Sequence, residues 1–184
     1  MSVRLTLVRH GRASGGWDDH EDPGLDDVGH AQAHALADLL SASSPLPILV
    51  SPMRRCRETA APLAAAWDVE PTVEPLVTEV PSPEGVPMGE RVPWLRAAMD
   101  STWTALDSPF TDYRDAVVRR LLACRTDTLI VSHFVAINAA IGAALGNDRL
   151  LIYRLDNTSR TVLDVADGRL VLVEAGAEAD TQIR

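Results

Sequence analysis

Three short clusters of basic and hydrogen-bonding residues stand where apolar runs of the chain end. The first is Arg9-His10-Gly11, the second covers residues 51–55, and the third is Ser132-His133. Ligands of open α/β sheets bind outside the carboxyl ends of the strands. If the apolar runs are strands of one sheet, the three clusters are predicted to meet in a single crevice.

Such a crevice favours the binding of an anion. The clusters contribute Arg9, His10, Arg55 and His133, and none of these has a carboxylate within its own motif. A ligand therefore has to bring the negative charge, and a phosphoryl group suits the forked donors of a guanidinium. Helices that begin after Ser51 and His133 would add backbone N–H donors and the positive end of a dipole. The residue types predict a phosphate site.

A histidine at the floor of this site points to covalent catalysis. Neutral imidazole is a nucleophile near neutral pH and can hold a phosphoryl group transiently. To attack from Nε2, His10 must keep its proton on Nδ1, and it can do so by donating to a backbone carbonyl in the tight turn that Gly11 permits. A general acid must then protonate the departing alkoxide. We expect His10 to be the phosphoryl acceptor.

Strand and helix patterns alternate around these clusters and would position them. Strands are expected over residues 3–8, 47–50, 71–78, 128–132, 150–155, 161–165 and 170–174, and helices over residues 25–40, 53–67, 94–105, 113–124 and 135–145. Pro62 is expected to kink or restart its helix. Asp167 and Gly168 are typical of a hairpin turn, and the prolines between residues 81 and 93 indicate an irregular candidate substrate loop.

This order of elements predicts an α/β fold. Helices that alternate with apolar strands favour a three-layer α/β/α sandwich with a mostly parallel central sheet, and the late hairpin adds an antiparallel edge strand. The length of 184 residues fits a single domain over residues 1–184. No linker or internal repeat divides the chain.

Composition excludes several functional classes. The formal net charge of −9 argues against a nucleic-acid binder, which needs clustered Lys and Arg. No apolar stretch approaches the roughly 20 residues of a membrane-spanning helix, and no secretory signal pattern precedes Val3. Cys56 and Cys124 match neither a disulfide framework nor a metal or redox motif. We expect a cytoplasmic protein with two buried thiols and no membrane partner.

Four motifs follow one another in a fixed order over residues 5 to 145. They are Leu7-Val8-Arg9-His10-Gly11, then Leu25-Asp26-Asp27-Val28-Gly29 with Gln32-Ala33, then Ser51-Pro52-Met53-Arg54-Arg55 with Thr59-Ala60, and last Val131-Ser132-His133. Together they resemble the histidine phosphatase superfamily, the phosphoglycerate-mutase-like group. A lone Arg-His-Gly would be a weak signal, whereas the ordered set is specific.

The resemblance implies a role for each matching residue. His10 would be the phospho-acceptor, Arg9, Arg55 and His133 would complete the phosphate pocket, and neither a metal nor a cofactor would be needed. The pocket arginine of the family's second cluster is the fourth residue after the serine, which selects Arg55. The family's general acid follows a short apolar strand after the next helix, which points to Glu79.

Two departures from the family pattern fall at the mouth of the expected pocket. Phe134 stands where a small residue usually follows the second histidine, and Val80-Pro81-Ser82-Pro83 replaces the glycines that often follow the acid. The segment between the second and third clusters is also shorter than in the glycolytic mutases. It leaves less chain to enclose a second phosphate, which favours hydrolysis over mutase chemistry.

The general acid has several competitors among nearby residues. They are Glu74, Glu84 and Glu90 around the same segment, and Asp18 and His20 in the first loop. His30 and His34 stand four residues apart, but no carboxylate completes a metal motif around them, so we expect both on a solvated helix face. Glu79 is the acid that the resemblance favours.

Other phosphatase chemistries leave no trace in the sequence. No cysteine is followed by an arginine six positions later, and neither a DxDxT motif nor a GxxxxGK[ST] loop is present. The motifs thus predict a metal-independent phosphatase acting on a small phosphate monoester, with a phosphoprotein substrate and a homodimer left open. Mutase-type phosphotransfer and a catalytically silent phospho-ligand-binding domain are the alternatives.

Overall fold

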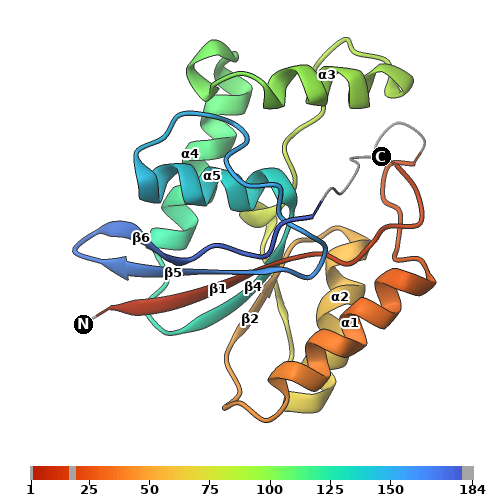
Figure 1. Cartoon of the computed structure of the whole chain (residues 1–184), viewed down its shortest axis with the longest axis vertical. Coiled ribbons are helices and arrows are strands. Elements are labelled where there is room, and N and C mark those ends of the chain that lie inside the picture. Colours follow the sequence, from red (N-terminus) through yellow and green to blue (C-terminus); the bar gives the residue numbers. More distant parts are fainter. Residues whose placement is uncertain (1, 17–19, 180–184) are drawn as a thin grey trace.

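A six-stranded sheet forms the centre of the protein in a computed structural model, which describes residues 2–16 and 20–179 (Figure 1). Its strands are β1 Val3–Arg9, β2 Ile48–Val50, β3 Thr72–Val73, β4 Thr128–Ser132, β5 Arg160–Ala166 and β6 Arg169–Glu174, in the spatial order β3-β2-β4-β1-β5-β6. The strands β3, β2, β4 and β1 are parallel to one another, while β5 is antiparallel to β1 and to β6. The predicted α/β class with an antiparallel edge is confirmed.

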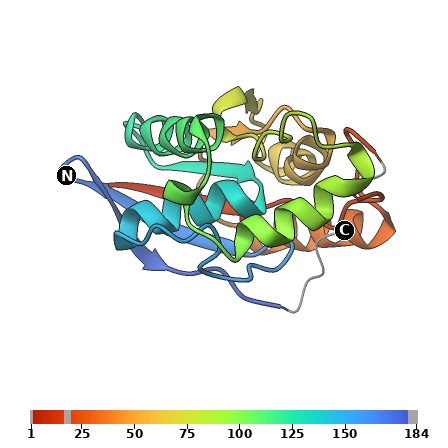
Figure 2. The same ribbon diagram turned by 90° about the horizontal axis from the view of Figure 1, so that it is seen from above.

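Helices cover the sheet from two sides. They are α1 Asp27–Leu40, α2 Arg54–Trp67, α3 Arg91–Met99, α4 Ser108–Leu122 and α5 Phe134–Leu145, with the short 3-10 helices η1 Pro75–Val77, η2 Met88–Glu90 and η3 Trp103–Ala105. Figure 1 shows α4 and α5 above the strands and α1 and α2 below them. Seen from above, α3 and α5 overlie the strands (Figure 2).

Two hydrophobic clusters fill the spaces between these layers. Alternate residues of a strand point to opposite faces, so Leu7 and Ile130 pack towards α4 and α5. Val8 and Val131 pack with buried residues of α1 and α2 on the other face. Because both faces of the central strands are covered, β4 is buried at every position, as is typical of a parallel strand.

Sheet register brings the three polar clusters to one edge. Arg9 lies opposite Ser132 across β1 and β4, and Val50 lies opposite Val131 across β2 and β4. The chain leaves these strands through two further backbone hydrogen bonds, His10 N to Ser132 O at 3.0 Å and Ser51 N to Val131 O at 3.1 Å. The residues that follow all three strands are therefore neighbours.

Several element boundaries differ from the sequence predictions. Residues 150–155 form no strand, because this segment turns over α5, where Asn138 Oδ1 accepts from the N–H groups of Ile152 and Tyr153. The third strand is only two residues long and continues as η1. The predicted irregular stretch contains η2 and the start of α3, with Pro93 in the first turn of that helix, where its missing N–H is tolerated.

Pro62 was expected to kink or restart its helix, and the restart does not occur. The α2 helix continues from Arg54 to Trp67, and residues on both sides of the proline, Ala60 and Leu63 among them, are buried in the cluster shared with α1. Packing of this apolar face therefore outweighs the missing backbone hydrogen bond.

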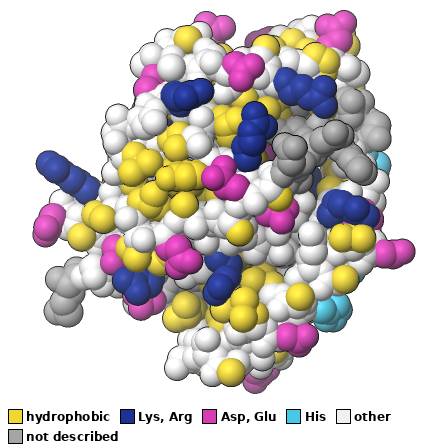
Figure 3. All heavy atoms as spheres, in the orientation of Figure 1, with side chains coloured by type: hydrophobic (Ala, Val, Ile, Leu, Met, Phe, Trp, Pro, Cys, Tyr) yellow, Lys and Arg dark blue, Asp and Glu magenta, His cyan; other side chains and the backbone are white. Residues whose placement is uncertain are grey.

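The described residues on the face of the molecule seen in Figure 1 form no continuous basic patch of the kind that binds nucleic acid. Acidic and basic side chains are interspersed over this face, with hydrophobic groups between them (Figure 3). Within the described part of the chain, no helix is both long and apolar enough to span a membrane.

Candidate active site

Four basic side chains are buried together at the carboxyl edge of the sheet. Arg9, His10 and Arg55 expose 6%, 7% and 7% of their surface, and His133 exposes none. Residues of these types are seldom buried unless they are paired or serve a site. All four come from the three clusters that the sequence singled out, so the predicted convergence is present.

His10 has distinct partners for its two ring nitrogens. Nδ1 lies 2.7 Å from the carbonyl oxygen of Gly11, and the Nε–H of Arg55 donates to Nε2 at 3.2 Å. A carbonyl only accepts and a guanidinium only donates, so the proton is on Nδ1 and the lone pair is on Nε2. Burial and the nearby Arg55 and Arg9 hold the pKa of His10 well below its usual value. The ring is neutral in the tautomer that a nucleophile at Nε2 requires.

The turn after His10 is held by backbone and side-chain contacts. Asn157 Nδ2 donates to the carbonyl of His10 at 2.9 Å, and the N–H of Gly11 donates to Thr59 Oγ1 at 2.9 Å. A Cβ on Gly11 would lie 2.8 Å from the carbonyl oxygen of Gly29, which is too close. Glycine is required here by this close approach and not by a positive φ, since Gly11 is absent from the glycines with that conformation.

Arg55 bridges the two histidines from the first turn of α2. Besides its contact with His10, its Nη2 lies 3.2 Å from His133 Nδ1. Arg54 points outward and pairs with Glu58 at 2.6 Å, and Arg57 is exposed. Helical spacing therefore turns only Arg55 of these three arginines into the site.

Arg9 places a charged guanidinium in the site, and only some of its N–H groups have hydrogen-bond acceptors in the described part of the chain. Its Nη1 donates to the carbonyl of Leu155 at 2.6 Å, and its guanidinium lies 5.0 Å from the ring centroid of Phe134. Burial lowers the pKa of Arg9 to about 10, which leaves the group charged at neutral pH. Among the described residues its Nε is buried without a hydrogen-bond partner, a state that costs about 1–3 kcal/mol.

His133 stands at the N-terminus of α5 between these groups and a second polar layer. Its Nε2 lies 2.7 Å from Ser51 Oγ and 3.3 Å from Cys56 Sγ. Its ring centroid is 5.2 Å from that of His10. Burial and the charge of Arg55 keep the pKa of His133 well below its usual value, so this imidazole is also neutral.

Glu79 is the predicted acid, and the structure brings it beside His133 and within the influence of Arg55 and Arg9. Its Oε2 lies 4.0 Å from His133 Nδ1, its Oε1 accepts from the N–H of Val80 at 2.9 Å, and 15% of its side chain is exposed. Burial raises the pKa of Glu79, although its bond to Val80 and the charges of Arg55 and Arg9 oppose that shift. A raised pKa suits a group that must carry a proton near neutral pH.

The competing acids lie in other surroundings. Glu74 is paired with Arg120, which lowers its pKa, and Glu84, Glu90 and His20 are exposed. Asp18 lies outside the described residues. Of the described competitors, none has a contact with the two histidines or with Arg9 and Arg55.

The exposed histidines do not join this site. His30 and His34 lie on the outer face of α1, and His30 Nε2 is 3.9 Å from Glu58. Over the described part of the chain, no group of three or more His, Cys, Asp or Glu side chains could hold a metal ion. Cys56 and Cys124 are buried free thiols.

Several supporting residues were not predicted to contact the site. Asn157, which holds the carbonyl of His10, comes from a polar loop before β5 where no motif marks it. Gly29 and Thr59 belong to motifs of the sequence, yet spacing alone does not reveal that they pack against the turn at Gly11. Such contacts depend on how α1 and α2 approach β1.

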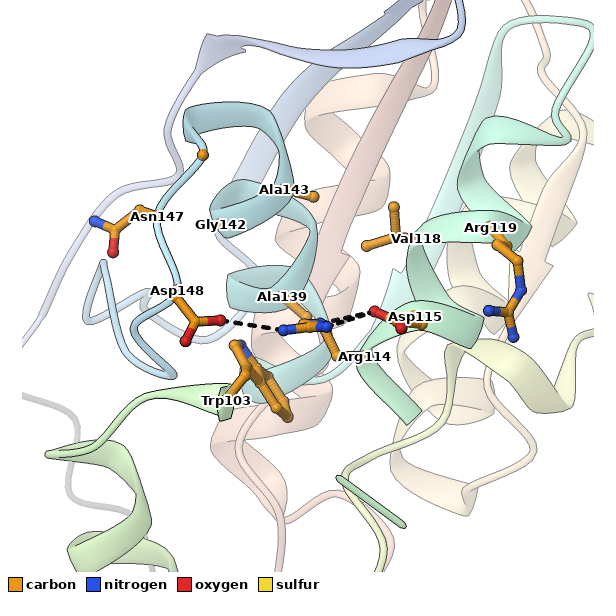
Figure 4. Close-up of a pocket in the computed structure, with 11 residues that line it drawn as sticks. Trp103, Arg114, Asp115, Val118, Arg119, Ala139, Gly142, Ala143, Asn147 and Asp148 are labelled. Carbon is orange, nitrogen blue, oxygen red and sulfur yellow. Dashed lines mark hydrogen bonds and ion pairs between the residues drawn. The ribbon is translucent and has the colours of Figure 1, made fainter. Parts of the chain in front are cut away.

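A separate pocket of about 440 Å³ lies between α4 and α5 (Figure 4). Figure 4 shows Arg114 between Asp115 and Asp148, with ion pairs of 2.8 and 3.1 Å. The small residues Ala139, Gly142, Ala143 and Gly146 of the α5 side leave the space open. None of the lining residues is a histidine, and the charges at its centre are already paired, so the chemistry described above lies elsewhere.

Solved structures with the same fold cover almost the whole chain. A mycobacterial glucosyl-3-phosphoglycerate phosphatase in complex with VO3 is 23% identical, with a TM-score of 0.74 over 96% of this chain and 100% of that one. A putative α-ribazole-5'-P phosphatase from Escherichia coli is 21% identical, with a TM-score of 0.76 over 96% and 97%. A phosphoserine phosphatase from Entamoeba histolytica, in complex with 3-phosphoglyceric acid, is 23% identical, with a TM-score of 0.77 over 97% and 98%.

Comparison with protein families identifies the chain from its sequence. A search of curated proteins gave no significant match. The family model described as the histidine phosphatase superfamily, branch 1, matches residues 5–178, a span that includes all four motifs and every residue of the buried basic site. This chain therefore belongs to branch 1 of the histidine phosphatase superfamily.

Proposed function

We propose that the protein is a phosphatase that hydrolyses phosphate monoesters, without a metal ion, through a phosphohistidine on His10. The observation that carries this proposal is the state of His10, whose Nδ1 proton is held by Gly11 and whose Nε2 lone pair faces the guanidinium of Arg55. A neutral, oriented imidazole beside fixed cations is what covalent phosphoryl transfer needs.

The phosphoryl group would bind between Arg9, Arg55 and His133. Glu79 acts electrostatically on the two buried guanidinium groups, and Asp156 also acts on Arg9. A bound phosphoryl group would give both guanidinium groups a further anionic partner that matches their forked donors. A phosphoryl oxygen would also give the unpartnered Nε of Arg9 an acceptor. We expect the contact between Arg55 and His10 Nε2 to be replaced by Arg55–phosphate bonds, which frees the nucleophile.

The reaction would proceed in two displacements. His10 Nε2 attacks phosphorus and the bond from phosphorus to the ester oxygen breaks, while Glu79 in its protonated form gives its proton to that oxygen and an alcohol leaves. A water oxygen then attacks the phosphohistidine as the Glu79 carboxylate takes a proton from the water. The nitrogen–phosphorus bond breaks, its electron pair returns to Nε2, and phosphate departs.

A small phosphate monoester is the substrate class that we favour. The names of the structural neighbours give glucosyl-3-phosphoglycerate, α-ribazole-5'-P and phosphoserine as phosphatase substrates, all of them small phosphate esters. The short segment between the second and third clusters supports hydrolysis over mutase-type transfer, which requires a second phosphate to be held. A silent binding domain would gain nothing from a correctly protonated nucleophile beside an acid.

The test is a screen of phosphate release from such monoesters, with and without excess chelator. We expect turnover that chelator does not alter and that vanadate inhibits, because vanadate adopts the five-coordinate geometry of phosphoryl transfer. His10→Ala should lower turnover by about 10⁴-fold or more, since a nucleophile that works as part of a unit is removed. His30→Ala, which removes an exposed histidine of α1, is the matched control and should keep the wild-type rate.

Activity that disappears on chelation and returns with zinc or magnesium would overturn the metal-independent mechanism. A His10→Ala variant that stays folded and turns over at the wild-type rate would overturn the role of His10.

A further inference from the structure

Glu79 belongs to no helix or strand, yet the backbone before it is held by side chains from two other elements. It follows η1 and Thr78 and precedes the proline-rich stretch at Pro81. Residues on such connecting segments are usually more mobile than those on helices and strands. A general acid needs a defined position relative to the leaving group, so the contacts that hold this segment bear on its function.

Two hydroxyl groups donate to the two carbonyls that precede Glu79. Ser132 Oγ donates to the carbonyl of Val77 at 2.7 Å, and Tyr113 Oη donates to the carbonyl of Thr78 at 2.9 Å. Ser132 is the last residue of β4 and directly precedes His133, so its bond ties the segment to the edge that carries the phosphate pocket. Tyr113 reaches the segment from α4.

The same helix makes a second attachment two turns further on. Arg120 of α4 forms an ion pair with Glu74, whose carboxylate also caps the start of η1 by accepting from Leu76 N. Residues seven apart lie on one face of a helix, so Tyr113 and Arg120 both face the segment from the same side. Val77 between these attachments is 1% exposed and packs in the core.

We infer that Tyr113 is a positioning residue for Glu79, holding the Thr78 peptide so that the Glu79 carboxyl stays beside His133 and the leaving group. This inference rests on the proposed function, in which Glu79 is the general acid. The Thr78 carbonyl belongs to the peptide group that joins Thr78 to Glu79, so its orientation sets where the Glu79 side chain begins. The phenol stands close enough for the Glu79 carboxylate to help raise its pKa, together with burial.

Tyr113→Phe tests this role because it keeps the ring and its packing near Trp103 and removes only the hydroxyl. We expect the variant to lose about three- to tenfold in kcat on an alkyl phosphate such as 3-phosphoglycerate, the loss typical of one hydrogen bond, with KM unchanged. p-Nitrophenyl phosphate needs little help from an acid and should be affected much less. Tyr153→Phe, which alters the only other tyrosine of the chain, is the matched control.

A double-mutant cycle separates positioning from general damage. In a Glu79→Gln background, Tyr113→Phe should cause no further loss on the alkyl phosphate, because the group through which it acts is gone. A full additional loss in that background, or an equal loss on both substrates in the single variant, would overturn the inference.

If no monoester is hydrolysed, that result contradicts the proposed function. The role of Tyr113 can still be tested by a measurement that does not depend on turnover. The carboxyl ¹³C shift of Glu79 can be titrated by NMR in the wild type and in Tyr113→Phe. The titratable and charged groups that face this carboxyl are Arg9 of β1, Arg55 and Cys56 of α2, His133 at the start of α5 and Tyr113 itself. Burial dominates its raised pKa, so a loosened, better hydrated Glu79 should titrate at lower pH. The same titration curve in both proteins would contradict the inference.

Discussion

The proposed phosphate pocket and the proposed acid beside it are built in different ways. Arg9, His10 and His133 stand directly at the ends of two hydrogen-bonded strands, and Arg55 stands in the first turn of a helix. Glu79 instead lies in a connecting segment, and side chains of β4 and α4 hold the backbone before it. The sheet thus positions the groups that we propose to bind and receive phosphate, while tertiary contacts position the group that we propose as the acid for the leaving oxygen.

This difference teaches how the two parts can vary. A strand end moves only if the sheet moves, so the pocket for phosphate is tied to the fold itself. A connecting segment can change in length and composition while the sheet stays intact. The acid and the mouth beyond it are therefore where we expect chains of this fold to differ in the substrates they accept.

Of all the variants, Glu79→Gln should give the largest difference between the rate on an alkyl phosphate and the rate on p-nitrophenyl phosphate. Without a proton donor, hydrolysis of an alkyl phosphate should slow by about 10² to 10⁴-fold, because an alkoxide is a poor leaving group. p-Nitrophenolate departs largely unaided, so hydrolysis of p-nitrophenyl phosphate should change far less. Rates on both substrates report the contrast, and an equal loss on the two would make Glu79 a structural residue of the pocket.

The pH profile sharpens the same contrast. The raised pKa of Glu79 keeps it protonated to a higher pH than an ordinary glutamate, and above that pKa the acid form declines about tenfold per pH unit. The rate on an alkyl phosphate should therefore fall as pH rises through the Glu79 pKa, and this limb should be missing in Glu79→Gln. A falling limb that survives unchanged in the variant would assign it to another group.

Phe134→Leu should give a smaller effect that falls on the phosphate pocket alone. A cation–π contact such as that between the Phe134 ring and the Arg9 guanidinium contributes about 0.5–2 kcal/mol. Its loss should weaken the affinity for vanadate by roughly 2- to 30-fold. Because the phosphate is common to all substrates, kcat/KM should decline equally for alkyl and p-nitrophenyl esters. Phe110→Leu, at the other phenylalanine, controls for the loss of a buried ring.

If Phe134→Leu lowered kcat/KM for one ester much more than for the other, the phosphate pocket and the leaving-group side of the site would not be separate parts. That result would mean that the ring contacts the leaving group and not only Arg9.

Sequence reasoning succeeded where the strands determine the geometry. The runs predicted as strands over residues 3–8 and 128–132 form β1 and β4, and their parallel pairing brings His10 and His133 together. The tautomer of His10 follows from a local contact with the next residue, which spacing can foresee.

Contacts between distant segments were beyond such reasoning. The hairpin at Asp167 and Gly168 is local and was predictable, because Asp-Gly is a preferred pair for a turn that needs positive φ at both central residues. Both residues do adopt a positive φ. Residues 150–155 were also expected to form a strand, yet Asn138 of α5 binds their backbone and no strand forms. Asn157, Thr59 and Tyr113 take part through packing of loops and helices, for which no periodic pattern exists in the sequence.

The central claim is that His10 carries the phosphoryl group, and rapid acid-free trapping of the enzyme with a labelled monoester tests it most directly. The label should be stable in base, labile in acid and located on His10 alone, as expected for a phosphoramidate formed by Nε2. It should be missing in His10→Ala and accumulate in Glu79→Gln with p-nitrophenyl phosphate, where water attack lacks its base. A label on any other residue, or full turnover by an enzyme that never becomes labelled, would contradict the account.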